Sequence, residues 1–187
     1  MSSIIKLIKA IEFSDIKFSD IPKLCVLAKL NRVSFYFLHK IISQYSTQPL
    51  TCLKEEYLRK SRIFSETLRK LVSISKVFKY YGIDHTVFKT FRPYPFTTVD
   101  IDVLIFNNFF GAIKCLLSRN HTILGSGPES VTFSSPGGVS VDLYREVAVS
   151  RVVYVDKDVL RKHVTEVETP FGVVVNLSPE ADLIAFA

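Results

Sequence analysis

The spacing of hydrophobic residues divides the chain into a helical first half and a second half rich in strands. Between residues 53 and 81, apolar side chains recur at intervals of three, four and seven, which predicts a long helix ending at Gly82. Two apolar stretches within residues 16–45 predict further helices. The run 4–11 is interrupted by lysines and predicts an amphipathic helix rather than a signal peptide.

After Gly82 the pattern changes to short alternating runs separated by turn residues. The predicted strands are 85–88, 99–106, 121–124, 130–134, 139–147, 165–168 and 172–176, and the predicted helices are 109–119, 158–163 and one that begins at Ser178. Residues 90–98 contain two prolines and are predicted to form a loop, and 125–128 to form a turn. The last helix is short and apolar, so we expect more helix to follow it.

This order of elements predicts an α+β protein in which a mixed, mostly antiparallel sheet carries flanking helices. We expect a helical N-terminal region over residues 1–50 and an α/β domain over residues 51–187.

The clearest chemical signal is a pair of aspartates within an apolar strand. Side chains alternate along a strand, so Asp100 and Asp102 share one face, roughly 6.6 Å apart along the strand axis. Two like charges at that spacing repel one another, and a divalent cation such as Mg²⁺ relieves the repulsion. The alternative is an edge strand whose two aspartates are solvated.

A third carboxylate, Asp142, lies on a later strand candidate. Alternation places Ser140 and Tyr144 on the same face as Asp142, and Val141 and Leu143 on the other face. A single aspartate on a strand is usually just exposed, but a strand that pairs beside the first would bring all three carboxylates together.

The composition is compatible with an anionic partner and argues against several classes of protein. The net charge of +6 is compatible with a nucleotide or nucleic-acid ligand, although many of the basic residues fall on predicted helices where a solvated face is the simpler explanation. Three scattered cysteines fit neither a disulfide framework nor a zinc site. No apolar run approaches the ~18 residues of a membrane span. We therefore expect a cytoplasmic protein without a membrane partner.

The sequence of strand, loop, Asp-x-Asp strand, helix, hairpin and Asp strand resembles the DNA-polymerase-beta-like nucleotidyltransferase superfamily. More closely, it resembles a poorly characterised nucleotidyltransferase-like family with a helical N-terminal region and a Lys-Gly before the loop. The resemblance covers most of the chain, over the segments 18–42, 81–89, 100–102, 141–144 and 178–182.

The resemblance implies transfer of a nucleoside monophosphate from an NTP to a hydroxyl or phosphate acceptor on RNA, a protein or a small molecule. Two Mg²⁺ or Mn²⁺ ions would be held by Asp100, Asp102 and Asp142, and Asp142 is also the candidate base. The candidate phosphate contacts are Lys89, Thr90, Arg92, Thr97 and Thr98.

Two departures from the family pattern bear on activity. Thr90 stands where the family has a glycine that lets backbone amides approach the triphosphate, and Phe96 stands where an arginine is frequent. A catalytically silent nucleotidyltransferase fold that binds a nucleotide or a protein is therefore an alternative. A basic nucleic-acid-binding protein is a second alternative. We expect weak NTP binding, with slow or no transfer in the absence of an acceptor partner.

Overall fold

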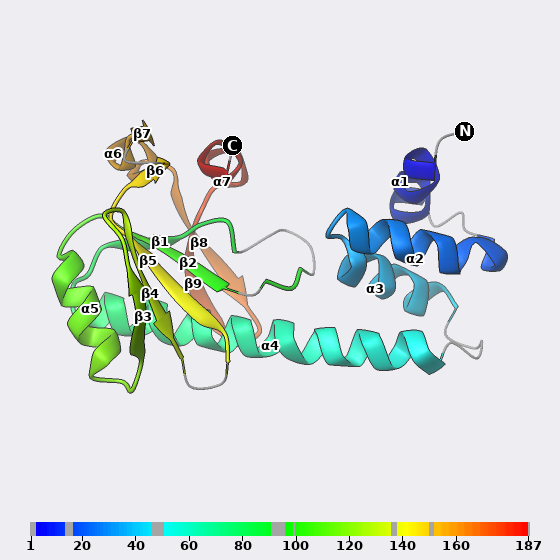
Figure 1. Ribbon diagram of the computed structural model, residues 1–187, viewed down its shortest axis with the longest axis horizontal. Coiled ribbons are helices and arrows are strands. Elements are labelled where there is room, and N and C mark those ends of the chain that lie inside the picture. The colour runs from blue at the N-terminus through cyan, green and yellow to red at the C-terminus, as the bar shows by residue number, and fades with distance from the viewer. Residues whose placement is uncertain are drawn as a thin grey trace. The chain divides into compact units, whose positions relative to one another are not determined.

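The computed structural model describes residues 3–13, 17–45, 51–90, 96–98, 100–135, 138–149 and 152–186. The first elements are helical (Figure 1): α1 (Ser3–Phe13), a short 3₁₀ helix (Phe18–Asp20), α2 (Ile21–Leu30), α3 (Ser34–Gln44) and α4 (Thr51–Tyr80). None of the helices within the described ranges combines the length and the apolar character needed to cross a bilayer.

The second half of the chain supplies the strands and three shorter helices. In chain order these are β1 (His85–Val87), β2 (Asp100–Ile105), α5 (Phe109–Leu117), β3 (Thr122–Ser126), β4 (Ser130–Ser134), β5 (Ser140–Tyr144), β6 (Val147–Val149), β7 (Val152–Val155), α6 (Lys157–Arg161), β8 (Val164–Thr169), β9 (Gly172–Leu177) and α7 (Pro179–Phe186).

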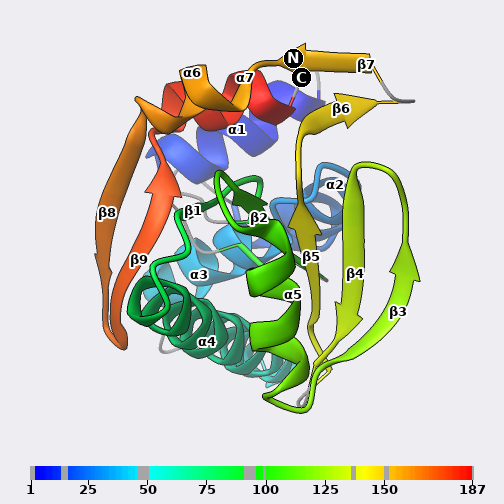
Figure 2. The same cartoon turned by 90° about the vertical axis from the view of Figure 1, so that its left-hand side faces the viewer.

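Seven of these strands form one mixed sheet in the order β3-β4-β5-β2-β1-β9-β8 (Figure 2). The β2–β5 and β1–β9 pairs are parallel, and the other four neighbouring pairs are antiparallel. β6 and β7 pair with each other in a separate two-stranded sheet. The prediction of an α+β fold with a mixed, mostly antiparallel sheet is confirmed.

The two faces of the large sheet differ in what covers them. On one face, His85 of β1 contacts α4 through a hydrogen bond to Ser75 and an edge-on packing against Phe78. Ile101 and Val103 of β2 share this face by alternation and are fully buried. On the opposite face, Phe88 and Leu104 pack with residues of α6 and α7, and Asp100 and Asp102 lie on this same face.

The chain divides into two compact units within α4, between Ser65 and Glu66, and Phe96 and Thr97 group with the first unit. The core of the first unit is formed by apolar residues from its three N-terminal helices: Leu7, Ile21, Leu24, Ala28, Phe37 and Ile41. Phe35 of α3 also packs against Tyr57 and Phe64 of α4 within this unit. The expected boundary at residue 50 stays a prediction.

Most predicted elements are present, with bounds that differ by a few residues. α4 runs to Tyr80, and Gly82 follows it at φ +64°, the left-handed conformation that glycine adopts at a helix end without steric cost. Residues 91–95 of the predicted 90–98 loop lie outside the described residues, as does Val99 at the start of the predicted 99–106 strand.

Two local predictions were wrong, and one strand was missed. Gly125 and Ser126 belong to β3, where a register shift between Ile123 and Gly125 accommodates the glycine, so the turn begins only at Gly127. The predicted strand 139–147 is two strands, because the chain leaves the large sheet after Tyr144 and β6 pairs elsewhere. The strand β7 was not predicted, although its sequence Val-Val-Tyr-Val is rich in strand-forming residues.

Candidate active site

Two of the three predicted acidic residues face each other across neighbouring strands. β2 and β5 are parallel, and their register pairs Asp102 with Asp142 and Asp100 with Ser140. Residues paired in this way point to the same side of a sheet, so all three carboxylates lie on one face. The prediction that the Asp142 strand pairs beside the Asp-x-Asp strand is confirmed.

Asp102 is the most buried of the three, with a relative exposure of 8%. Burial raises the pKa of its carboxyl to about 7, and the nearby charge of Asp100 adds to that rise. The ammonium of Lys89 and a hydrogen bond from the Tyr144 hydroxyl act in the opposite direction. The backbone N–H of Asp102 donates to Thr90 Oγ1 at 2.8 Å, which fixes the strand at this residue.

Asp142 has one carboxylate oxygen without a partner. Its Oδ1 is buried and accepts no hydrogen bond from any described residue, while the Thr132 hydroxyl donates to the carboxylate. Burial raises the pKa of Asp142, and the charge of Asp100 raises it further. A buried oxygen without a donor is costly, so this atom is the natural place for a proton or a cation.

Asp100 lies at the beginning of β2 and is only half-buried. The hydroxyl of Thr98 donates to its Oδ1 at 3.0 Å, so Thr98 orients this carboxylate. Thr98 was predicted to contact phosphate. In the structure its hydroxyl is hydrogen-bonded to Asp100, which is a candidate metal ligand.

The turn that follows β1 has an unusual backbone conformation. Lys89 has a φ of +61°, and the N–H of Thr90 donates across it to the carbonyl of Phe88 at 2.7 Å, which is the hydrogen bond of a γ-turn. The N–H of Lys89 donates to Asp182 Oδ1 of α7 at 2.5 Å. Both backbone amides of the turn are therefore occupied by acceptors of the chain itself.

The Lys89 side chain extends over the aromatic residues beside the acidic cluster. Its ammonium lies 5.0 Å from the ring centre of Phe88 and 5.4 Å from that of Tyr144. These two rings pack edge to face, with their centres 5.1 Å apart. At these distances the rings attract the cation, and the arrangement holds the positive charge close to Asp102.

Three residues that contribute to this site were not predicted from the sequence. Tyr144 and Thr132 hydrogen-bond two of the aspartates, and Asp182 holds the turn at Lys89. Strand alternation had already placed Tyr144 on the face of Asp142, which was a usable signal. Asp182 gave none, because an acid in the first turn of a helix is ordinarily explained by the helix dipole.

Of the remaining predicted phosphate contacts, only Thr90 lies beside the acidic cluster in the described part of the chain. Arg92 lies outside the described residues. Thr97 belongs to the first compact unit and is described apart from this site. Thr90 is buried, and its hydroxyl already accepts the Asp102 amide. The phosphate-binding roles of these residues stay predictions.

The carboxylates suit Mg²⁺ or Mn²⁺ in kind, since hard cations select oxygen ligands and Asp142 offers a free one. Across the part of the chain that the structure describes, however, no three acidic, histidine or cysteine side chains are gathered closely enough to enclose an ion. The metal assignment of Asp100, Asp102 and Asp142 therefore stays a prediction.

Comparison with known proteins identifies no family. No family model matches the sequence, and no curated protein is significantly similar to it. Among solved structures, the lincomycin-bound lincosamide antibiotic adenylyltransferase LnuA aligns with a TM-score of 0.48 and 13% sequence identity, over 62% of this chain and 83% of that one. Similarity of this degree is not evidence of a shared activity.

Proposed function

We propose that the chain is a metal-dependent nucleotidyltransferase whose site is the cluster of Asp100, Asp102 and Asp142. The observation that supports this most is the register of β2 and β5, which pairs Asp102 with Asp142 on the face that also carries Asp100. Three carboxylates crowded on one face, with a raised pKa at two of them, form a group that a divalent cation would stabilise.

In the proposed reaction, an acceptor hydroxyl attacks the α-phosphorus of an NTP. A new oxygen–phosphorus bond forms, the bond from the α-phosphorus to the bridging oxygen breaks, and pyrophosphate leaves. The free Oδ1 of Asp142 takes the hydroxyl proton. Bound Mg²⁺ or Mn²⁺ would lower the pKa of that hydroxyl and neutralise the triphosphate. Lys89 supplies a cation for the phosphates, and Thr98 orients Asp100.

A second candidate function is binding without catalysis, and the turn at Lys89 favours it. The amides of Lys89 and Thr90 donate to Asp182 and Phe88. A triphosphate would have to break these bonds or be held by side chains alone. Lys89 and Tyr144 also offset part of the charge of Asp102 without a metal. A site compensated in this way suits a module that binds a nucleotide or a protein.

Mn²⁺ binding followed by electron paramagnetic resonance distinguishes the two candidates. Wild-type protein is expected to bind the ion, and saturation at a hundred times its dissociation constant would stabilise the fold by about 2.7 kcal/mol. Asp102→Asn and Asp142→Asn should each lose this response. Glu168→Gln, which removes a carboxylate from the exposed strand β8, is the matched control and should bind Mn²⁺ like the wild type.

Activity is then tested with α-labelled NTPs, Mg²⁺ or Mn²⁺ and cell extract as a source of acceptors. Labelling that is lost in Asp100→Ala and kept in Glu168→Gln supports nucleotidyl transfer. Stabilisation by NTPs in the presence of EDTA, without Mn²⁺ binding or labelling, would establish the second candidate. Absence of metal binding, nucleotide binding and labelling would overturn the transferase and the nucleotide-binding form of the second candidate.

A further inference from the structure

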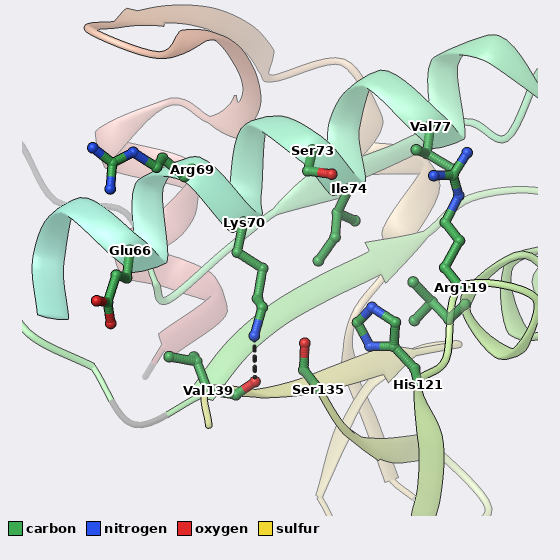
Figure 3. A pocket seen from close by; sticks show the side chains of 11 residues that line it. Glu66, Arg69, Lys70, Ser73, Ile74, Val77, Arg119, His121, Ser135 and Val139 are labelled. Atoms are coloured by element: carbon green, nitrogen blue, oxygen red, sulfur yellow. Dashed lines mark hydrogen bonds between the residues drawn. The ribbon is translucent and has the colours of Figure 1, made fainter. Parts of the chain in front are cut away.

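A cavity of about 500 Å³ opens on the other face of the sheet, away from the acidic cluster (Figure 3). Its walls come from the second half of α4, from the end of α5 and the residues just after it, and from Ser135 and Val139 at the ends of β4 and β5. Ser135 and Val139 continue the alternation that faces α4, whereas Thr132 and Asp142 belong to the acidic face. The volume is in the range of pockets that hold small organic ligands.

The cavity holds polar atoms that the protein itself does not satisfy. Among the described residues, neither Ser135 Oγ nor His121 Nδ1 has a hydrogen-bond partner although both are buried, and a buried polar atom is nearly always paired. Figure 3 shows these two side chains next to each other, on the same side of the cavity as the Lys70 ammonium. Two orphaned groups in one cavity indicate a ligand that completes their bonding.

The charges around these groups define the sign of that ligand. The Lys70 ammonium reaches across the cavity and donates to the Val139 carbonyl at 3.2 Å. Arg119 is a second lining cation, whereas Arg69 packs over the ring of Phe171. Glu66 is the one carboxylate among the lining residues. An anionic group is therefore favoured beside Lys70, His121 and Ser135.

The cavity also has an apolar lining. Ile74 and Val77 of α4 and Leu116 of α5 contribute aliphatic side chains to it. This combination of cationic, hydrogen-bonding and aliphatic groups matches a ligand with an anionic head and a compact apolar body.

We propose that this cavity is a binding site for a small organic anion, with its phosphate or carboxylate group on Lys70, Ser135 and His121 and its apolar body against Ile74, Val77 and Leu116. The site is separate from the acidic cluster and does not depend on the proposed transferase activity. Occupation would link α4 to the β4–β5 connection, next to the strand that carries Asp142.

The test is calorimetric titration of the full chain, in EDTA, with 1-naphthyl phosphate, 1-naphthoate and the neutral 1-naphthol. Both anions are expected to bind, and 1-naphthol to bind at least about tenfold more weakly, because a charge-assisted hydrogen bond is worth roughly that factor or more. Whichever anion binds more tightly identifies the preferred head group.

Two variants and one control assign the binding to this cavity. Lys70→Met should weaken both anions by about tenfold or more. Ser135→Ala leaves all charges in place and should weaken them by a smaller factor. Lys76→Met makes the same change on the same helix outside the cavity and should bind like the wild type.

The imidazole of His121 provides a spectroscopic readout that does not depend on affinity. Its pKa is lowered by burial and by the charge of Lys70, and a bound anion should raise it in an NMR titration. Equal affinity for 1-naphthol and the anions, or equal losses in Lys70→Met and Lys76→Met, would overturn the proposal.

Discussion

Asp102 is a buried acid whose neutral form is favoured by the fold, so its replacement by asparagine should stabilise the metal-free protein. Its pKa rises from an ordinary value of 3.8 to about 7. At about 1.4 kcal/mol for each pH unit, this rise corresponds to about 4 kcal/mol of preference for the neutral carboxyl. Asparagine has almost the same shape and carries no charge at any pH.

The sign of the pH dependence follows from which state binds the proton. Between pH 3.8 and about 7 the folded protein keeps the Asp102 proton and the unfolded chain has lost it. Stability is therefore lost as the pH rises through this window, by at most about 1.4 kcal/mol per pH unit, and the full penalty applies above pH 7. From pH 5 to pH 8, Asp102→Asn should gain about 2–3 kcal/mol relative to the wild type.

The assay is urea unfolding followed by far-ultraviolet circular dichroism at a series of pH values from 5 to 8.5, with EDTA present throughout. Taking the difference between the two proteins removes the contribution of other titrating groups. His85, for example, has a pKa lowered by burial. Its contribution to the stability of the fold changes in the opposite direction, because it is lost as the pH falls below 6.5. Stability curves that run parallel across the whole range would refute the burial argument for Asp102.

Three further predictions concern the surroundings of the site and the helix after β2. Tyr144→Phe removes a donor to Asp102 and should raise the pKa of that carboxyl further, which an NMR titration of the carboxyl carbons measures directly. Lys89→Gly should have a free energy of unfolding about 1 kcal/mol higher than Lys89→Ala in urea, because alanine keeps the strain of a φ of +61° and glycine removes it. Equal stabilities of the two variants would contradict this. Gly111→Ala places a Cβ against the Asn108 side chain that caps α5, and should cost about 1 kcal/mol in the same assay, whereas Gly125→Ala, where a Cβ meets open space, should cost less.

The parts of the fold that were predictable from sequence are those in which local pattern and packing agree. α4 has a continuous helical stripe, and β2 has strict alternation that puts Ile101 and Val103 in the core. The exchange of partners after Tyr144 was not predictable, because the strand pattern continues through residue 147 while the sheet it belongs to changes. Alternation describes a strand's faces and says nothing of its neighbour.

The candidate site was predictable only as far as single strands determine it. The carboxylates of Asp100 and Asp102 had to share a face, whereas the pairing of Asp102 with Asp142 depends on the register of β2 and β5. The turn at Lys89 was different. A positive φ at a lysine has no sequence signature, and it is held by Asp182, a residue 93 positions away. Because a distant residue holds this turn, the absence of glycine did not reveal that its backbone has a positive φ.

The parallel pairing of β2 with β5 also constrains how the protein folds. Forty residues separate the paired Asp102 and Asp142, and the chain between them must form α5 and the β3–β4 hairpin. Closing this long loop carries an entropic cost, and the last step brings like charges together. We expect β5 to dock late and to dock faster at higher ionic strength, since salt screens the repulsion. During synthesis, the acidic cluster cannot exist until the chain beyond Tyr144 has left the ribosome.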